Sequence, residues 1–166
     1  MTTPGNSASN GVTLVIDAPP GTIYRAFTSP DALEAWQAPG EMTATVHRFD
    51  LRTGGGYEMS LRYPESTPDA PGKTTDHEDR YTARFVELVP QERIVQAIRF
   101  DTVDPAFAGE MTMTVTLAEC AGGTAVTIAY ANVPPGIRPE DNEAGTRMSL
   151  EKLAAWVASQ GVTGER

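Results

Sequence analysis

The sequence predicts an α+β domain in which a curved antiparallel sheet of about seven strands wraps a long C-terminal helix, with two short helices after the first strand. Three observations support this fold class. Seven segments alternate apolar and polar residues, which is the pattern of strands with one buried face. Short turns join several of these segments, so neighbouring strands run antiparallel. The chain then ends on a long stretch with the 3.6-residue period of a helix.

The expected strands comprise one N-terminal segment and six later ones. Pro19 and Pro20 stop the first segment, because proline cannot donate to a strand ladder. Turn residues at 54–56, 89–93 and 121–123 supply hairpin connections. The expected strands are 12–17, 43–50, 56–63, 80–89, 93–101, 109–118 and 124–131.

Two short helices in tandem are expected between the first two strands. Ser29 followed by Pro30 supplies an N-cap and a first-turn proline in the middle of this stretch. The apolar residues with helical spacing are Ile23, Phe27, Leu33 and Trp36.

The one long helix is expected over 139–159, with Pro139 near its start. Its apolar stripe is expected to consist of Met148, Leu150, Leu153, Trp156 and Val157. An antiparallel meander has one face that must be covered, and only this helix is long enough to cover it. This arrangement is a helix-grip fold, which can leave a cavity between the sheet and the helix.

A single domain over residues 12–160 accounts for most of the 166-residue chain. A domain of this size buries roughly 70% of the surface that its unfolded chain exposes. Residues 1–11 are polar and are expected to form a disordered arm, without the features of a secretory signal. Residues 161–166 are expected to be a flexible tail.

The charge and the cysteine content narrow the classes of partner and compartment. A net charge of -9 argues against nucleic acid, whose backbone favours clustered Lys and Arg. No apolar run approaches the roughly 20 residues of a membrane span. The single cysteine, Cys120, cannot form an internal disulfide, which fits a cytoplasmic location. Its expected role is that of a small side chain near a strand end.

Two glycine-containing stretches resemble nucleotide-binding loops without fitting them. Residues 54–56 are three glycines followed by a strand, whereas a dinucleotide-binding loop needs G-x-G-x-x-G before a helix. A hairpin bend is therefore expected there. The PGKTT stretch at 71–75 lacks the first glycine of a P-loop, because Thr67 occupies that position. The proline-rich excursion at 64–79 that contains it is instead expected to be a mobile loop, in a place where it could act as a lid.

No metal, cofactor or catalytic motif is expected. The DHED run at 76–79 is interpreted as a solvated acidic stretch, because consecutive strand residues point in alternate directions and cannot converge on one ion. His47 is interpreted as a hydrogen-bonded sheet residue. The sequence has no nucleophile elbow and no Cys-His signature.

The remaining candidate site is an apolar inner wall. Flexible methionines and tyrosine hydroxyls on the inward strand faces favour a cavity, although a closed core stays the alternative for each residue. Arg84, Arg99 and Arg147 are possible anchors for an anionic group, or solvent-facing residues. The predicted ligand-binding residues are Trp36, Tyr57, Met59, Phe100, Met111, Met113, Tyr130 and Met148.

Four stretches resemble one known family. APPGTIYRAFTSPDALEAW, DLRTGGGYEM, ARFVELVPQERIV and AGTRMSLEKLAAWV, in this order, are similar to the Hsp90-ATPase-activator-homologue-like branch of the START and Bet v 1 superfamily. The resemblance covers about residues 12–159 and implies the helix-grip fold. Many relatives have Gly-Trp at the start of the last helix, where this chain has Gly145 and Thr146.

Three functions follow as hypotheses. The resemblance implies a carrier of a hydrophobic small molecule, such as a lipid, polyketide or aromatic compound, bound between the sheet and the terminal helix. The second hypothesis is a protein that interacts with a chaperone and stimulates its ATPase. The third is an enzyme of the cyclase or hydratase type that uses Tyr or Glu inside the cavity. A homodimer is a further possible assembly.

Overall fold

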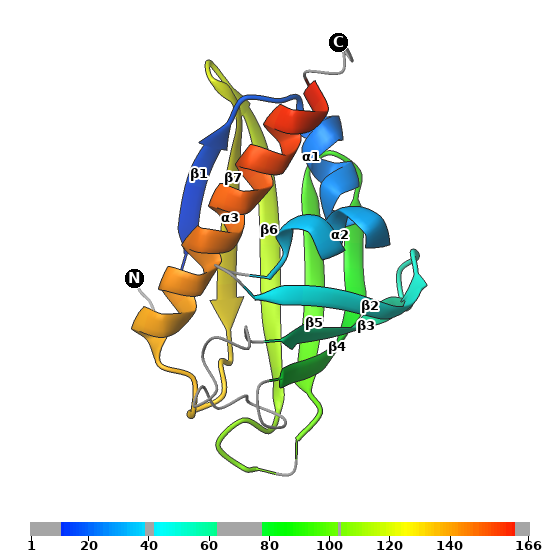
Figure 1. Cartoon of the computed structure of the whole chain (residues 1–166), viewed down its shortest axis with the longest axis vertical. Coiled ribbons are helices and arrows are strands. Elements are labelled where there is room, and N and C mark those ends of the chain that lie inside the picture. Colours follow the sequence, from blue (N-terminus) through cyan, green and yellow to red (C-terminus); the bar gives the residue numbers. More distant parts are fainter. Residues whose placement is uncertain (1–10, 39–41, 63–77, 103, 162–166) are drawn as a thin grey trace.

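The computed structural model describes residues 11–38, 42–62, 78–102 and 104–161 (Figure 1). Most of the expected N-terminal arm, most of the C-terminal tail and most of the loop at 64–79 lie outside these residues. Within the described part, no helix is both long and apolar enough to cross a membrane.

The architecture is the predicted one, a seven-stranded antiparallel sheet with three helices. The strand order in the sheet is β1-β7-β6-β5-β4-β3-β2, so all neighbours except β1 and β7 are also neighbours in sequence. The elements are β1 (Val12–Ile16), α1 (Pro20–Phe27), α2 (Pro30–Trp36), β2 (Thr43–Asp50), β3 (Gly56–Arg62), β4 (Glu78–Val89), β5 (Arg93–Phe100), β6 (Glu110–Cys120), β7 (Gly123–Ala131) and α3 (Pro139–Gly161).

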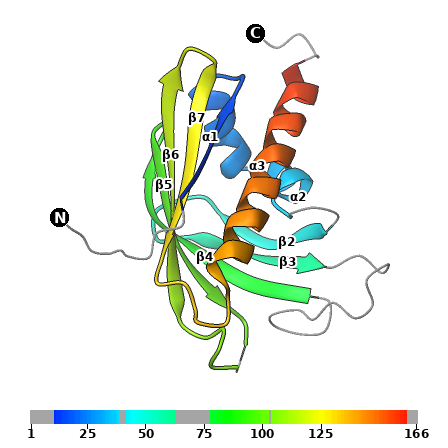
Figure 2. The same ribbon diagram turned by 90° about the vertical axis from the view of Figure 1, so that its left-hand side faces the viewer.

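The sheet curves around α3. Figure 2 shows β5, β6, β7 and β1 on one side of the molecule and α3 on the other, with β2, β3 and β4 turning beneath the helix. Two register shifts, one in β2 after Val46 and one in β4 after Phe85, mark bulges that increase the bend of these strands. Together they produce the concave face on which the helices pack.

The three glycines at 54–56 form the hairpin bend between β2 and β3, as predicted. Gly54 has φ +90° and donates its N–H to the carbonyl of Phe85, 2.8 Å away. A Cβ on Gly56 would collide with the carbonyl oxygen of Ala83 and lie 2.9 Å from the Cα of Arg84. The glycines therefore let β3 begin in close contact with β4.

The two short helices are held by their caps and by one buried indole. Ser29 caps α2 by accepting from the N–H of Ala32. Trp36 donates from Nε1 to the carbonyl of Ala26 over 2.9 Å, and its ring meets Phe27 edge-on at 4.7 Å. This bond satisfies the polar atom of a fully buried tryptophan and fixes α2 against α1.

The long helix α3 packs on the concave face through one stripe. Leu150, Leu153 and Val157 are buried on it, as the helical period predicts. The helix is also tied to the end of α2, because Ser149 donates to the carbonyl of Gln37 and Lys152 donates to that of Ala38.

The predicted apolar stripe of α3 was wrong for one residue, Met148. Met148 is 42% exposed, on the outer face of α3. It lies two residues from Leu150, and residues two apart on a helix point in nearly opposite directions. A stripe that contains Leu150 and Leu153 therefore cannot also contain Met148.

Candidate functional site

A cluster of phenols lies inside the apolar interior between the sheet and α3. Gln96 donates from Nε2 to the hydroxyl of Tyr57 over 3.2 Å, and Tyr81 donates to the sulfur of Met59 over 3.2 Å. The rings of Tyr57 and Tyr81 lie 6.4 Å apart in an edge contact. Two hydroxyls and an amide are thus buried together among apolar side chains.

The interior keeps these phenols protonated. Burial raises the pKa of Tyr57 to about 12, although hydrogen bonds with Gln96 and Tyr81 partly oppose this effect. Burial raises the pKa of Tyr81 well above its ordinary value, and the neighbouring phenols add to it. Burial also raises the pKa of Tyr130, with a hydrogen bond from Thr146 acting in the other direction. At neutral pH all three are neutral hydrogen-bonding groups.

Two polar side chains near the N-terminus of α3 extend this cluster. Thr146 Oγ1 on α3 lies 3.4 Å from the hydroxyl of Tyr130 on β7 and donates to the carbonyl of Asn142 over 2.7 Å. The side-chain Nδ2 of Asn142 is buried and has no hydrogen-bond partner. An unsatisfied buried amide is uncommon in a folded protein and calls for an explanation.

The inward side chains of β5 become slightly more exposed toward the end of that strand. Along β5 the exposed fraction rises from 0% at Ile94 to 5% at Ile98 and 9% at Phe100. Along the neighbouring strand β6 it is 5% at Met111, 0% at Val115 and 6% at Leu117, so it rises toward both ends of that strand. The rise along β5 points to the lower end of the sheet in Figure 1, where β5 ends and β6 begins. This is the end beside the first turns of α3.

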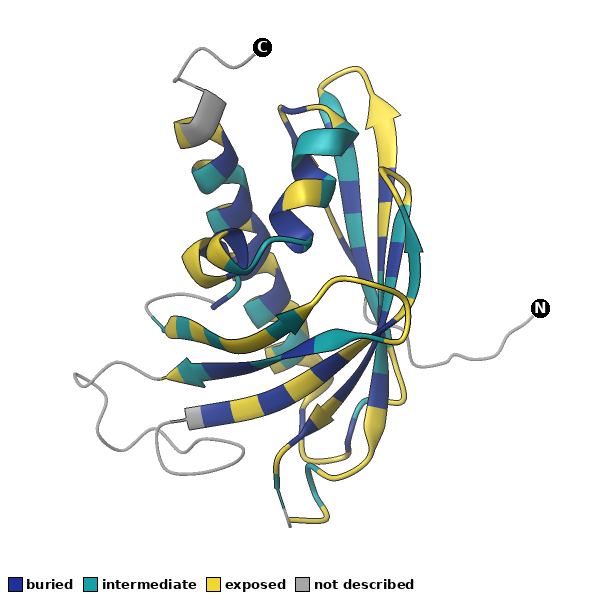
Figure 3. Ribbon diagram, turned by 90° about the vertical axis from the view of Figure 1, so that its right-hand side faces the viewer, coloured by how far each residue is buried: buried dark blue, intermediate teal, exposed yellow. Residues whose placement is uncertain are grey.

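Several fully buried side chains leave no space for a guest beside them. A side chain without accessible surface touches no cavity that a water molecule could occupy, and this holds for Met59 of the phenol cluster as well as for Phe85, Ile94, Val115, Leu150 and Leu153. The expected hollow between the sheet and the helix is therefore absent beside these side chains. Figure 3 shows the corresponding run of buried positions on the strands and on α3.

Two loops cover the lower end. Gly136 donates its N–H to the carbonyl of Ala106 over 2.6 Å, and a Cβ at position 136 would lie 2.9 Å from the ring of Phe107. Ile137 beside it is 8% exposed. A contact between two loops, rather than a sheet hydrogen bond, therefore joins these segments at the lower end.

The structure brings most of the predicted lining residues together. Tyr57, Met59, Met111 and Met113 are buried on the concave face, and Tyr130 is partly buried. Phe100 is also buried, at the lower end, while Trp36 belongs to the helix–helix core and Met148 to the outer surface. Whether any of them binds a ligand stays a prediction.

Sequence reasoning missed the polar members of this cluster. Gln96 occupies the inward phase of β5 between Ile94 and Ile98, so a polar residue in an apolar alternation was the available signal. Asn142 and Thr146 are four residues apart on the inner stripe of α3, and the same signal applies to them.

The three arginines considered as anchors point away from the interior. Arg84 and Arg99 lie near Glu110, at 3.6 and 3.9 Å, and Arg147 lies 3.8 Å from Glu143. All three side chains are at least half exposed. Within the described part of the chain they therefore occupy the solvent-facing position considered as the alternative.

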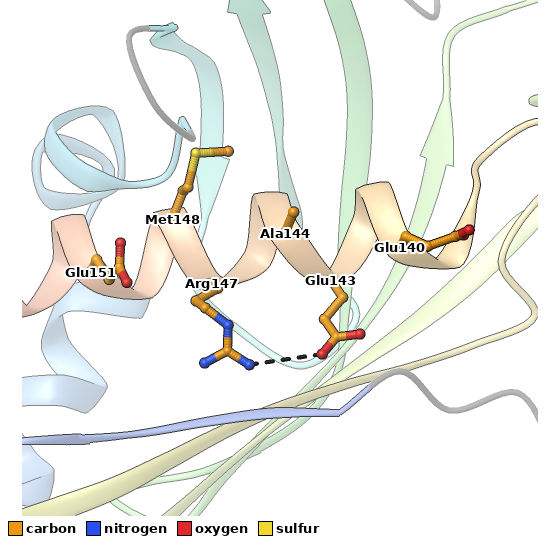
Figure 4. A pocket seen from close by; sticks show the side chains of 6 residues that line it. All are labelled: Glu140, Glu143, Ala144, Arg147, Met148 and Glu151. Carbon is orange, nitrogen blue, oxygen red and sulfur yellow. Dashed lines mark ion pairs between the residues drawn. The ribbon is translucent and has the colours of Figure 1, made fainter.

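Two surface grooves are lined by described residues. One, of about 400 Å³, follows the outer face of α3 past Glu143, Arg147 and Met148, all of which are exposed (Figure 4). The other, of about 610 Å³, lies beside the start of α1 and the turn at Gln91. Neither adjoins the phenol cluster.

The remaining polar candidates have structural roles. His47 shares a 2.8 Å hydrogen bond with Ser60, as predicted. Asp79 departs from the expected solvated run, because it is 2% exposed at the inward phase of β4. Cys120 is an exposed residue at the end of β6. Among the described residues no group of three or more potential ligands could hold a metal ion.

The fold and its partly closed interior define a helix-grip protein of the START and Bet v 1 class. The family model for Activator of Hsp90 ATPase homolog 1-like proteins matches residues 17–158, so the chain belongs to this family. No functionally curated protein matches the chain.

Several solved structures are similar to it. Protein CV1439 from Chromobacterium violaceum is 34% identical, with a TM-score of 0.78, over 90% of this chain and 96% of that one. The AHSA1-like protein from Aeromonas hydrophila is 17% identical, with a TM-score of 0.70, over 96% and 98% of the two chains. A protein from Arthrobacter aurescens, 19% identical over 91% and 86%, has a TM-score of 0.75. The last two similarities concern the fold alone.

Proposed function

We propose that the protein binds a hydrophobic small molecule, of lipid, polyketide or aromatic type, at the lower end of its interior between the sheet and the first half of α3. One observation carries the proposal: hydroxyl and amide groups gather in an otherwise apolar interior, and the amide of Asn142 there has no partner. Buried hydroxyls and amides cost free energy unless they are paired, so an interior that served only for packing would favour apolar residues there.

The side chains around the phenol cluster are suited to holding a small molecule that can be exchanged. Met59, Met111 and Met113 have flexible side chains that can repack around a guest. Tyr130 and Asn142 offer polar groups to orient it, and the amide of Asn142 still lacks a partner. A guest with one hydrogen-bond acceptor would satisfy that amide.

The guest is expected to be small, because it must displace side chains that already fill the site. Removing roughly 200 Å² of apolar ligand surface from water gives about 5 kcal/mol before the costs of binding are subtracted. Breaking the hydrogen bond between Gly136 and Ala106 offsets part of this binding free energy. We therefore expect micromolar rather than nanomolar affinity for a simple apolar compound.

The cyclase or hydratase alternative receives less support from the phenols. General acid–base catalysis works best when the pKa of the catalytic group is near the working pH. The pKa of Tyr57 is raised to about 12, and those of Tyr81 and Tyr130 are also raised, which moves all three away from neutrality. These hydroxyls suit recognition better than proton transfer.

The chaperone alternative rests on the family description alone. Direct binding to Hsp90 with stimulation of its ATPase, together with an empty interior, would favour it over the ligand carrier. Native mass spectrometry of protein purified from its own host separates the two, because a copurifying small molecule supports the carrier.

The decisive experiment is a titration with 1-N-phenylnaphthylamine, a neutral probe that fluoresces in apolar sites. We expect the wild-type protein to bind it, and Met111→Trp, which fills the lower end, to lose at least tenfold in affinity. Val15→Trp adds the same ring at a position that is 51% exposed and serves as the matched control. Circular dichroism checks that each variant is folded.

Equal binding by wild type and Met111→Trp would contradict the proposed site. Should Met111→Trp fail to fold, Tyr130→Phe keeps the volume and removes the hydroxyl next to Thr146. An acceptor-bearing probe such as 1-naphthaldehyde should then bind the Tyr130→Phe variant more weakly than wild type. Unchanged affinity for that probe would argue against recognition by the phenol cluster.

A further inference from the structure

The polar residues of the interior form a row that crosses the sheet and continues onto α3. The strand register pairs Gln96 on β5 with Met113 on β6, and Met113 with Tyr130 on β7. Gln96 and Tyr130 are therefore two strand spacings apart, roughly 10 Å, with Met113 between them. Thr146 and Asn142 on α3 follow, because Thr146 Oγ1 lies 3.4 Å from the hydroxyl of Tyr130 and 2.7 Å from the carbonyl oxygen of Asn142.

The end of this row on α3 has an excess of hydrogen-bond donors. Asn142 Nδ2 carries two N–H groups, is buried and has no hydrogen-bond partner. The single proton of Thr146 goes to the carbonyl of Asn142, which is its shorter contact. The 3.4 Å contact between Thr146 and Tyr130 is long for two hydroxyls, so the proton of Tyr130 is weakly bound or free, whichever oxygen donates. A guest that presents an acceptor atom is therefore favoured here.

The interior also disfavours a negative charge. Burial is the largest cause of the raised pKa of Tyr57, Tyr81 and Tyr130, which means that the phenolate form is destabilised at all three positions. A carboxylate of a guest at the same place would lose its hydration in the same way. Such a guest needs a buried cation to compensate that loss.

No buried cation is found among the described residues. Asp79 is the only charged side chain among those that are buried in this part of the chain, and it is acidic. Arg93 and Lys152 are partly buried, but Arg93 pairs with Glu87, and Lys152 donates to a backbone carbonyl at the end of α2. The other basic residues that the structure describes are exposed.

We propose that the guest is a neutral molecule with an acceptor oxygen, such as a ketone, ester or lactone, and that Asn142 and Tyr130 select it by donating to that oxygen. This inference rests on the proposed ligand-binding function and narrows its class of ligand. A hydrocarbon leaves the amide of Asn142 unpaired. A free carboxylic acid is ionised at neutral pH and would have to lose its hydration. Fatty acids and other carboxylates are therefore outside the class.

Met113 is expected to change its rotamer to admit the guest. It is 3% exposed and lies between Gln96 and Tyr130 in the row. Its unbranched side chain can adopt several conformations at little cost. The apolar body of the guest would then lie along β6, with its oxygen toward α3.

Three naphthalene derivatives of similar size test this class of ligand. 2-Acetylnaphthalene carries a ketone, 2-ethylnaphthalene has no acceptor, and 2-naphthoate carries a carboxylate that is ionised at neutral pH. NMR titrations of isotope-labelled protein give the dissociation constant of each compound. We expect the ketone to bind about fivefold more tightly than ethylnaphthalene, and at least about tenfold more tightly than naphthoate.

The side-chain amide of Asn142 reports on the contact directly. Its NMR signal, identified by its loss in Asn142→Leu, should move further with acetylnaphthalene than with ethylnaphthalene. Asn142→Leu should reduce the advantage of the ketone over ethylnaphthalene to less than about twofold. Met148→Leu places a leucine on the exposed face of the same helix without a change of charge, and should leave both affinities unchanged. Should Asn142→Leu fail to fold, Tyr130→Phe removes the other donor and should reduce the same advantage.

The outcomes separate this inference from the function on which it rests. Equal affinity for acetylnaphthalene and ethylnaphthalene, or tighter binding of naphthoate, would overturn the class of ligand and leave a carrier of another kind. A signal of Asn142 that does not move while the ketone binds would overturn the selection by Asn142. Absence of binding by all three compounds would overturn the proposed function and this inference together.

Discussion

The hydroxyl of Tyr57 on β3 lies 3.2 Å from Nε2 of Gln96 on β5, although β4 runs between the two strands. Both side chains are 1% exposed, so neither can exchange this bond for a bond to bulk water. Losing Tyr57 takes this partner from the buried amide of Gln96, and losing Gln96 leaves the hydroxyl of Tyr57 with its hydrogen bond to Tyr81. The two residues are therefore energetically coupled.

A double-mutant cycle on this pair should show that coupling. We expect Tyr57→Phe and Gln96→Leu each to lower the free energy of unfolding by about 1–3 kcal/mol, because each removes a buried hydrogen bond. The double variant should be at least about 1 kcal/mol more stable than the sum predicts. Urea unfolding measures all four proteins.

An exposed pair provides the control for this cycle. Thr13 and Thr127 share a 2.8 Å hydrogen bond across β1 and β7 that is open to solvent. The corresponding cycle with Thr13→Val and Thr127→Val should give a coupling near zero, since water replaces the lost partner. Additive effects at Tyr57 and Gln96 would mean that their bond does not matter to the folded state.

The phenol cluster should make the protein sensitive to alkali. The pKa of Tyr57 is about 12 in the folded protein, above its ordinary value of 10.0, so the folded state binds the proton more tightly. Its contribution is present in full below pH 10 and is lost as the pH rises toward 12. Two pKa units correspond to roughly 3 kcal/mol at the upper end. Tyr81 and Tyr130 act in the same direction.

Phenolate absorbance at 295 nm, recorded together with circular dichroism, measures this effect. We expect Tyr57, Tyr81 and Tyr130 to ionise only as the protein unfolds, and the Tyr57→Phe variant to lose less stability between pH 10 and 12. Ionisation of all five tyrosines near pH 10 in a protein that stays folded would contradict this prediction.

The fold could be predicted because it depends on local periodicity. The segment expected at 43–50 is the strand Thr43–Asp50, and the helix expected at 139–159 is α3, Pro139–Gly161. The largest difference at a strand end is two residues, at the start of β4 and at the end of β6. Alternation determines which side chains share a face, and the turn residues determine the order of the strands.

The site could be predicted only in part, because periodicity does not measure volume. The inward phase of Tyr57, Met111 and Tyr130 follows from alternation, but whether their side chains enclose a cavity depends on how α3 packs. The buried amide of Asn142 depends on that packing too. Sequence reasoning thus identified which strand residues face inward, and that they line a binding site stays a prediction.

The unpaired amide of Asn142 leads to a prediction about stability. Asn142→Leu removes a buried donor that lacks a partner, so we expect the free energy of unfolding of the ligand-free protein to rise by about 1 kcal/mol. Roughly 0.5 kcal/mol of this would come from helix propensity alone. Thermal unfolding measures the gain. Destabilisation by Asn142→Leu would indicate that the amide is satisfied in solution.

Two glycines of the bend between β2 and β3 are required for different reasons, one for its backbone conformation and one for lack of space. At Gly54 a Cβ has open space but φ is +90°, so Gly54→Ala should cost about 1–2 kcal/mol through backbone strain. At Gly56 a Cβ would collide with the carbonyl of Ala83, so Gly56→Ala must push β3 away from β4. We expect Gly56→Ala to cost at least about 3 kcal/mol, because it disrupts sheet pairing as well. Urea unfolding of the two variants gives the comparison, and equal losses would mean that β4 yields easily at Ala83. Gly56 begins β3, which carries Tyr57, and it pairs with Arg84 on β4, which carries Tyr81. A larger loss of stability at Gly56 than at Gly54 would therefore show that the close contact between β3 and β4 requires a residue without a side chain.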